Sequence, residues 1–432
     1  MKNKPTTIKE LCEFIWYLED KYELLDFELD GVKVWQYTRM QFYYKLAEAT
    51  GVLSQPHSRL SKMDKVKHLF SFIKNSFIDN YFTLEQKNIL ILSHSRVVKV
   101  DNEFIDIYTK YLIDELLLNK KDIVEFENSH LGVHQKQKQK FVHYTDWIAL
   151  CQRVYKIFIK VKIQRDKLNI LKKVEKEINN ICKSNIDLVS FCIKNIKTYK
   201  AIYKIYNKIF KKVKPKVYYT VVSYGQAPII KAAKDNFIDV VELQHGTFSK
   251  YHLGYSFPNR EKPLDYFPNK LYVWSQFWKK MIKLPIDDEY VVVDEFRYLN
   301  EQKSKFGHIK KKNNQLIVLS QGAIGNDIAE KFLEHYDIFK EYDIKYKLHP
   351  GEFDRWQNYP ALKKLIEFDN VEIVKNEIPL YILFAESSLQ IGVFSTALYE
   401  GVEFGCATLL LNINGIEYMD RFIELYDVEI LK

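Results

Sequence analysis

Residues 315–351, QLIVLSQGAIGNDIAEKFLEHYDIFKEYDIKYKLHPG, decide the fold. The run Gln315–Ser320 is short and apolar, which is typical of a buried parallel strand, and a polar turn follows it. The spacing predicts an amphipathic helix over 328–342 and a second strand over 344–348, which ends in the turn HPGE. A strand, a helix and a strand in this order predict a parallel sheet with a right-handed crossover.

The same alternation runs through two parts of the chain. After residue 351 the sequence predicts helices and strands in turn at 361–368, 371–374, 379–387, 389–393, 394–405 and 407–412. Upstream it predicts strands at 88–92, 123–127, 217–222 and 240–244, with helices at 105–120 and 227–237. Two such series predict an α/β protein with two doubly wound, Rossmann-like domains.

The expected domain organisation follows from where the pattern changes. Residues 1–85 read as a helical N-terminal segment, and 86–275 as a first Rossmann-like domain that binds the acceptor and carries a basic helical insertion at 151–216. A Lys- and Asn-rich linker is expected over 276–314. Residues 315–432 then form the second Rossmann-like domain, expected to bind the nucleotide.

Composition excludes several classes of protein. With 432 residues, 47% of them hydrophobic, the chain can bury substantial cores, and 14 Gly and 11 Pro exclude collagen-like architectures. The 5 cysteines include no CxxC pair, which argues against a disulfide scaffold and a structural zinc site. Because we find no apolar leader and no run of about 18–20 uncharged apolar residues, we expect a cytoplasmic protein.

The net charge of +9 is regional. Residues 151–216 hold nineteen Lys and Arg against four Asp and Glu, with Tyr, Phe and Ile interleaved at helical spacing. Such helices can lie on an anionic membrane surface, or they can be a solvated face that covers the sheet. No nucleic-acid-binding motif accompanies the charge, so we do not expect a nucleic-acid partner.

The turns after the strands are where ligands are expected. The chain has neither GxGxxG nor GxxxxGK[ST], which argues against a nicotinamide enzyme and a P-loop ATPase. In open α/β sheets ligands bind beyond the carboxyl ends of the strands. The turns at those ends are SHSR (93–96), SYGQ (223–226), QHGT (244–247), SQG (320–322), HPGE (349–352) and FST (394–396).

In the first domain His245 is the candidate general base, since an imidazole at the mouth of the sheet can take a proton from an acceptor hydroxyl. Glu242 points to the same side if the strand continues, and it could orient that imidazole. The alternative is that His245 is an ordinary turn residue. The residues expected to line the acceptor side are Gln244, Gly246, Thr247, Tyr224, Gly225, His94 and Arg96.

In the second domain a histidine and a helix N-terminus are candidate donor ligands. His349, fixed by Pro350, can hydrogen-bond a phosphate. Ser395 and Thr396 open a helix, where hydroxyls and free backbone N–H groups can bind an anion. Glu400, one turn deeper, could accept both hydroxyls of a ribose. The other predicted donor residues are Gln321, Gly322 and Gly351. Each of these also fits an ordinary turn, cap or solvated acid.

The layout VELQHGT, YKLHPGE and GVFSTALYEG resembles bacterial GT-B type glycosyltransferases that build capsule or lipopolysaccharide from CMP-sugars, such as sialyltransferase-like and Kdo-transferase-like enzymes. By this resemblance His349 and Pro350, with Ser395 and Thr396, hold the nucleotide and its phosphate. CDP-glycerol glycerophosphotransferases are similar in their HGT and HP segments, which implies His245 as the base. The resemblance covers about residues 215–425 and, more loosely, 88–130. It implies a nucleotide-sugar donor, a glycan or glycolipid acceptor and no cofactor.

The sequence departs from that family at two motifs, which bear on the identity of the base and on the need for a metal ion. CMP-sialyltransferases of this kind have an Asp/Glu-Asp/Glu-Gly motif, and the nearest string here, ELDG at 28–31, lies in the N-terminal segment, so the base is either His245 or an acid. No DxD motif is present, which indicates a metal-independent donor site. A polyol-phosphate transferase, a non-catalytic scaffold of a polysaccharide assembly complex and a nucleotide-sugar epimerase remain alternatives. A peripheral location at the inner face of the plasma membrane would suit a lipid-carried acceptor.

Overall fold

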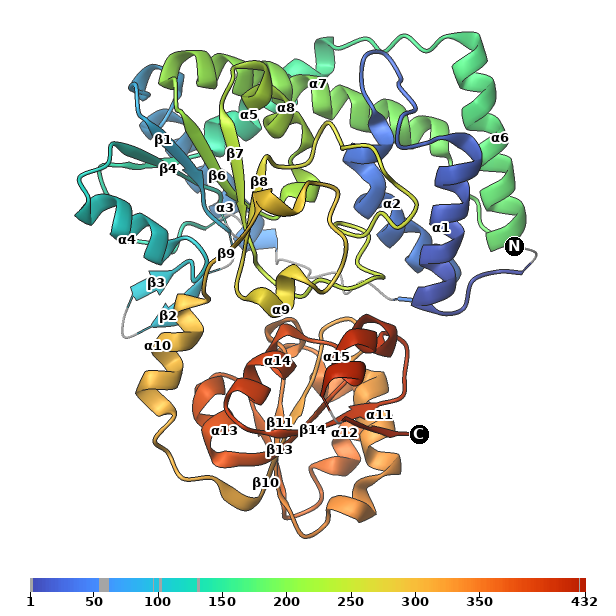
Figure 1. The fold of residues 1–432 in the computed structure, drawn as a ribbon, viewed down its shortest axis with the longest axis vertical. Helices are drawn as coiled ribbons and strands as arrows, with labels where there is room; N and C mark the ends of the chain where they lie inside the picture. The colour runs from blue at the N-terminus through green and yellow to red at the C-terminus, as the bar shows by residue number, and fades with distance from the viewer. Residues whose placement is uncertain (1–2, 54–61, 96, 101–102, 130–132, 427) are drawn as a thin grey trace.

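The computed structural model describes residues 3–53, 62–95, 97–100, 103–129, 133–426 and 428–432. These residues form one large parallel sheet in each of two domains, which lie one above the other in Figure 1. The first part of the chain contains α1 (Ile8–Tyr22), α2 (Val34–Thr50), α3 (Lys62–Ile78), β1 (Ile89–Leu92), β2 (Val98–Val100), β3 (Glu103–Ile105), α4 (Lys110–Leu118), β4 (Ile123–Glu127), β5 (Val142–Tyr144), α5 (Asp146–Phe158), α6 (Arg165–Cys182), α7 (Leu188–Val213), β6 (Val217–Val221), α8 (Ala227–Asp235), β7 (Asp239–Leu243), β8 (Lys270–Val273), α9 (Gln276–Lys279), β9 (Val291–Val293) and α10 (Arg297–Phe306). The second part contains β10 (Lys312–Leu319), α11 (Gly325–Glu334), β11 (Asp343–Lys347), α12 (Pro360–Leu365), β12 (Val371–Val374), α13 (Leu380–Glu386), β13 (Ser387–Gly392), α14 (Thr396–Glu403), β14 (Ala407–Leu411), α15 (Asp420–Leu425) and β15 (Glu429–Leu431).

The first sheet has its parallel strands in the order β5-β4-β1-β6-β7-β8-β9. The chain starts at β1, moves outward to β5, and returns through α5, α6 and α7 to β6 before it moves outward again to β9. The strand order therefore reverses between β1 and β6. A ligand crevice is expected beyond the carboxyl ends of these two strands, where residues 93–95 and 222–226 lie.

The second sheet repeats this plan in the order β12-β11-β10-β13-β14-β15, again with parallel pairing throughout the described strands. Here the order reverses between β10 and β13. The turns that follow these two strands are the predicted SQG and FST turns, at 320–322 and 394–396. The fold class predicted from the sequence, two doubly wound Rossmann-like domains of the GT-B type with a helical N-terminal segment and a helical insertion, is confirmed.

An apolar core passes through both domains. One cluster of buried side chains includes α1, α2 and the loop after β7, and it continues into the second domain. Trp278 of α9 packs on Tyr399 of α14 with ring centroids 4.7 Å apart. The hydroxyl oxygens of Tyr43, on α2, and Tyr418 are 2.6 Å apart. The helical N-terminal segment thus contacts both domains.

The N-terminal helices also brace the loop that follows β7. The buried guanidinium of Arg39 on α2 pairs with Glu19 on α1, with 2.6 Å between Nε and Oε1. The same guanidinium donates a hydrogen bond of 2.8 Å to the carbonyl oxygen of Ser256. A buried ion pair of this kind is strongly destabilising to break, because the remaining partner keeps an uncompensated charge. Residues 1–85 therefore help to position the segment just before Ser256.

Several strands escaped the sequence prediction. Residues 276–314, expected as a linker, contain α9, α10 and the edge strand β9, which pairs with β8 of the first sheet. The strands β5, β8 and β15 were also not predicted. Each of these strands has only three or four residues, so its apolar pattern is too short to stand out from the flanking sequence.

The basic insertion 151–216 folds as helices, but most of its apolar side chains face the protein. The apolar face of α7 is buried against the first sheet and α8, with Ile205, Ile209 and Phe210 at 4% exposure or less. Of the two alternatives that the sequence left open, a face that covers the sheet describes α7, whose apolar side chains do not face lipid. Helical periodicity shows that a face is covered but does not show what covers it.

Candidate functional site

The predicted base His245 lies in the turn directly after β7. Its Nδ1 is 3.3 Å from the hydroxyl oxygen of Tyr255. That hydroxyl donates a 2.6 Å hydrogen bond to Oε1 of Glu242, which also accepts the backbone N–H of Ser223 at 3.0 Å. Glu242 therefore reaches the imidazole through Tyr255 and not directly, as the sequence had suggested.

This chain of hydrogen bonds assigns the tautomer of His245. The single hydroxyl proton of Tyr255 is donated to Glu242, so the hydroxyl oxygen accepts from Nδ1–H of the imidazole. The lone pair then lies on Nε2. Burial lowers the pKa of His245 to about 3, and the nearby His252 and His94 act in the same direction. The imidazole is therefore neutral at pH 7, with Nε2 able to accept a proton.

Aromatic rings surround this imidazole. The ring centroids of Tyr108, Tyr224 and Tyr255 lie 6.4, 6.1 and 6.2 Å from that of His245. Tyr224 was predicted to line the acceptor side, and the structure brings it to the base. Rings of this kind exclude water from a base and offer flat apolar faces to a sugar.

Gln244 does not line the site, which corrects the sequence prediction. The residue is 1% exposed. Its side-chain N–H donates to the carbonyl oxygen of Gly246 at 2.8 Å, and its Oε1 accepts the backbone N–H of Trp274 at 2.9 Å. It therefore holds the shape of the turn that carries His245.

The other residues predicted on the acceptor side lie around the same edge of the sheet. The backbone N–H of His94 donates to Asp106 at 2.7 Å, and its ring packs on Tyr108 with centroids 5.6 Å apart. Thr247 is half-buried and Gly225 is exposed. Arg96 lies outside the described residues.

Three turns of the second domain converge at its switch point. Oε1 of Gln321 accepts the backbone N–H of Phe394 at 3.2 Å, which joins the SQG turn to the FST turn. A Cβ at Gly322 would lie 3.1 Å from Nδ1 of His349, so the HPGE turn packs against the SQG turn. The predicted donor residues of these turns are thus brought together.

His349 has the opposite tautomer to His245. Its Nδ1 accepts the backbone N–H of Gly351 at 3.1 Å, in a short helical turn that Pro350 begins. Nδ1 therefore carries no proton, and Nε2 is the N–H donor. A donor is the form that a phosphate oxygen needs.

Glu352 holds this turn in place. Its Oε2 accepts the backbone N–H of His349 at 3.0 Å, and its Oε1 accepts the hydroxyl of Ser320 at 2.9 Å. A Cβ at position 325 would lie 1.6 Å from the same carboxylate, so only the glycine at Gly325 leaves it room. The sequence contained the signal, because Glu352 stands three residues after the N-cap residue His349, at capping-box spacing. Its role was nevertheless missed.

The helix α14 begins at the FST turn. Ser395 caps it, accepting the backbone N–H of Ala397 at 3.2 Å, and Thr396 is the first helical residue. The hydroxyl of Ser395 thus serves the helix itself, while the first N–H groups carry the positive end of the helix dipole.

Glu400 lies one turn further along α14, as predicted. It is half-buried and accepts a 2.8 Å hydrogen bond from the hydroxyl of Tyr381. Burial raises the pKa of Glu400 to about 7, although the Tyr381 hydrogen bond opposes the shift. The carboxylate is therefore ionised only near and above neutral pH.

This raised pKa makes a prediction for stability. Between its ordinary pKa of 4.5 and about 7, Glu400 holds its proton more strongly in the folded chain, so its contribution to stability falls as pH rises through this window. Glu400→Gln removes that loss and should raise Tm by about 2–4 °C at pH 8. Thermal unfolding of wild type and variant at pH 8 and at pH 4.5 checks this. An equal gain in Tm at pH 4.5 would contradict it.

The two halves of the site meet at one contact. A Cβ at Gly246 would lie 3.4 Å from Oγ1 of Thr396. The turn that carries His245 in the first domain and the N-terminus of α14 in the second are therefore neighbours, although 150 residues separate them in sequence. Sequence reasoning placed both at strand ends.

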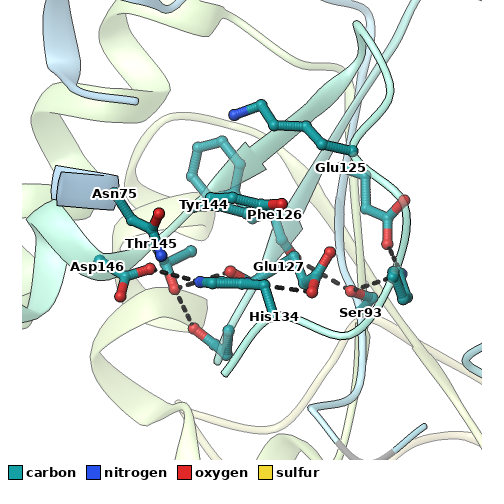
Figure 2. Close-up of polar contacts among 12 residues, drawn as sticks. Asn75, Ser93, Glu125, Phe126, Glu127, His134, Tyr144, Thr145 and Asp146 are labelled. Atoms are coloured by element: carbon teal, nitrogen blue, oxygen red, sulfur yellow. Dashed lines mark hydrogen bonds and ion pairs between the residues drawn. The ribbon is translucent and has the colours of Figure 1, made fainter. Parts of the chain in front are cut away.

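A second polar cluster lies at the same edge of the first sheet, after β4 and β5 (Figure 2). His134 lies between two carboxylates, 3.1 Å from Oε1 of Glu127 and 2.6 Å from Oδ2 of Asp146. These three side chains are at most 5% exposed, and the ring of Tyr144 stacks on His134 at 3.7 Å. Lys136 pairs with Glu125 beside them. The cluster fastens the segment 133–142 to the sheet, although Oε2 of Glu127 is buried without a hydrogen-bond partner among the described residues.

Two kinds of feature are absent from the described residues. No group of three or more His, Cys, Asp or Glu side chains is placed to hold a metal ion. No helix in the described ranges is both long and apolar enough to cross a membrane.

Comparison with known proteins finds similarity in structure only. No family model matches the chain, and no curated protein matches it significantly in sequence. UDP-GlcNAc 2-epimerase from Methanocaldococcus jannaschii superposes with a TM-score of 0.45 at 11% identity, over 79% of this chain and 88% of that one. The Neisseria meningitidis epimerase gives 0.44 at 14% identity, over 79% and 86%. A spinosyn rhamnosyltransferase gives 0.43 at 10% identity, over 80% and 86%.

Proposed function

We propose that the chain is a glycosyltransferase that moves a sugar from a nucleotide-activated donor, a CMP-sugar, to a hydroxyl of a bacterial surface polysaccharide or glycolipid. The contact between Gly246 and Thr396 carries the proposal. This contact brings the neutral imidazole of His245, whose Nε2 can accept a proton, close to the N-terminus of α14 in the other domain. A helix N-terminus is suited to binding a phosphate. A group-transfer reaction between two substrates needs this pairing.

The donor is assigned to the second domain. Its phosphate would lie against the N–H groups that open α14 at Thr396, with Nε2–H of His349 as a further donor. Its ribose would hydrogen-bond to Glu400. The choice of CMP rests on the resemblance of the HPGE and FST turns to CMP-sugar enzymes.

The acceptor is assigned to the first domain, which contains a cavity whose lining includes neither His245 nor Tyr224. The cavity has a volume of about 260 Å³ and lies between β3, α4, β4 and residues 135–142. Asp106 on its wall also accepts the backbone N–H of Tyr108, whose ring packs on His245. Gln135, Gln137 and Gln139 line the same cavity. Amides and carboxylates of this kind suit the hydroxyls of an uncharged sugar.

The reaction follows from the two tautomers. The acceptor oxygen attacks the anomeric carbon opposite the phosphate, so one C–O bond forms as the other breaks and the configuration inverts. The acceptor proton moves to Nε2 of His245, and the electron pair leaves with the phosphate. Tyr255 accepts Nδ1–H and so orients the imidazole, while Glu242 holds the Tyr255 hydroxyl. His349 and the α14 N–H groups stabilise the leaving charge without a metal.

The donor assignment predicts the effect of two substitutions. His349→Ala and Thr396→Val each remove a group from the developing phosphate charge and should lower kcat by about 10²–10³-fold. Phe237→Ser is the matched control, because Phe237 is 97% exposed in a turn between α8 and β7. Transfer from CMP-, UDP- and GDP-sugars, with calorimetry on CMP, CDP, UDP and GDP, provides the measurement.

Each outcome separates the proposal from its rivals. A glycosidic product formed from a CMP-sugar supports it, whereas a phosphodiester product identifies a polyol-phosphate transferase. Conversion of a nucleotide sugar without any acceptor identifies an epimerase. Nucleotide binding without turnover identifies a scaffold. Full activity in both His349→Ala and Thr396→Val contradicts the assignment of the donor site.

A further inference from the structure

Exposed apolar side chains gather on two helices and a short helical turn of the first domain. Of the twenty large hydrophobic side chains exposed among the described residues, ten lie on α3, α5 and the turn Tyr81–Thr83. They are Leu69, Phe70, Ile73, Phe77, Ile78, Phe82, Leu150, Val154, Ile157 and Phe158. We call them the α3–α5 apolar surface. The two helices pack against each other.

Helical spacing shows that the exposed apolar residues lie along one face of each helix. Phe70, Ile73 and Phe77 recur at intervals of three and four residues, and their exposures are 70%, 44% and 78%. Polar side chains of α3, Asn75 and Ser76, are buried on the opposite face at 8% and 7%. A helix that turns its aromatic residues outward and its polar residues inward requires a partner on the outer face.

Basic side chains lie beside this surface. Arg153, Lys156, Lys160 and Lys162 lie on α5 and just beyond it, and the guanidinium of Arg153 sits 5.2 Å from the ring centroid of Phe72 on α3. Two nearby acids are withdrawn from the surface, whereas the side chain of Glu85, just after the turn Tyr81–Thr83, is 78% exposed and pairs with Lys87. Asp79 pairs with Lys138 at 7% side-chain exposure, and Asp146 is held by His134 at 2%.

We infer that the α3–α5 apolar surface docks on a bilayer that contains anionic phospholipid. Aromatic and aliphatic side chains would enter the boundary between headgroups and acyl chains, while Arg153, Lys156, Lys160 and Lys162 would meet the phosphates. A protein partner for this surface would need an apolar centre surrounded by acidic side chains. An anionic membrane has both features, an apolar interior and negatively charged headgroups. The inference is independent of the proposed function.

The site of docking differs from the one predicted from the sequence. One of the two alternatives from the sequence placed it along 151–216, but the apolar face of α7 is buried, and the exposed large hydrophobic side chains described in that range are Val154, Ile157 and Phe158 of α5. The exposed part is completed by α3, whose sequence holds four Lys and one Asp. Both helices therefore contribute exposed apolar side chains, and both contain basic residues.

Vesicle sedimentation tests the inference with the whole protein. The wild-type chain should sediment with vesicles of phosphatidylcholine and phosphatidylglycerol, less so in high salt, and not with phosphatidylcholine alone. The double variant Phe77→Ser with Phe158→Ser should bind at least tenfold more weakly, on the order of the loss of two inserted aromatic side chains. Both residues are exposed, so the fold should survive, and Phe237→Ser is the control that should bind like wild type.

A second pair of variants tests the charges. Arg153→Gln and Lys156→Gln should each weaken binding to the anionic vesicles by about fivefold and reduce the dependence on salt. Equal sedimentation of the double variant and the wild type overturns the inference, as does failure of the wild type to bind at low salt. A wild-type dimer in light scattering that Phe77→Ser with Phe158→Ser converts to a monomer also overturns it, because the surface would then bind a second copy.

Discussion

Replacing His245 with alanine should lower kcat for sugar transfer by about 10²–10⁴-fold, with little change in KM for the donor. The substitution removes the group that takes the acceptor proton, while the donor groups at Thr396 and His349 remain. Because burial lowers the pKa of His245 to about 3, the imidazole stays neutral down to acid pH, so protonation of this residue should not limit the rate near pH 7.

The matched control is His308→Ala, which removes an exposed histidine between α10 and β10 and should leave kcat unchanged. Tyr255→Phe tests how Tyr255 positions the imidazole. It keeps the packed ring but removes the oxygen that accepts Nδ1–H, so kcat should fall, and the unfolding midpoint should fall as well because the buried carboxylate of Glu242 loses a hydrogen bond. Rates of single turnover for the variants provide the measurement. If His245→Ala retains wild-type kcat, an acid is the base.

Replacing His134 with alanine should destabilise the chain by about 3 kcal/mol at pH 6 to 7. Burial alone would lower the pKa of His134, but hydrogen bonds and charge from Asp146 and Glu127 raise it to about 9. The alanine variant leaves two carboxylates buried beside Tyr144 without their cation. The segment 133–142 should then detach from the sheet before the rest of the chain unfolds.

The pH dependence gives this prediction its sign. The folded pKa of His134 lies above its ordinary value of 6.5, so the stabilisation is complete below pH 6.5 and is lost as pH rises through about 9. Urea unfolding should therefore show a gap between wild type and His134→Ala that narrows from pH 6 to pH 9.5. A gap that stays constant over this range would mean that His134 is held for its shape and not for its charge.

Strand–turn–helix alternation was enough to predict both sheets, because buried parallel strands such as β1 and β10 are short apolar runs that end in polar turns. The edge strands β9 and β15 have three residues each, and their identity depends on a neighbouring strand. The sequence carries little local signal for such strands.

The candidate site divides in the same way. His245, His349 and Thr396 were predictable because the strand-end rule needs only the local sequence. Tyr255 and Tyr381 were not, because each acts on a partner from another element, Tyr255 on Glu242 and Tyr381 on Glu400. Gln244 was misassigned for the same reason, since its hydrogen bond to Trp274 is invisible in the sequence.

The close approach of Gly246 to Thr396 has a kinetic consequence. A separation of 3.4 Å from a Cβ position is van der Waals contact, so no hexose fits between Gly246 and Thr396 themselves. A substrate that binds between these two residues therefore requires the two domains to separate there. The hydrogen bond between Tyr43 and Tyr418, which joins α2 to the second domain, is a contact that such a separation would affect. Turnover would be paced by this breathing motion, and viscosity of the medium should slow it.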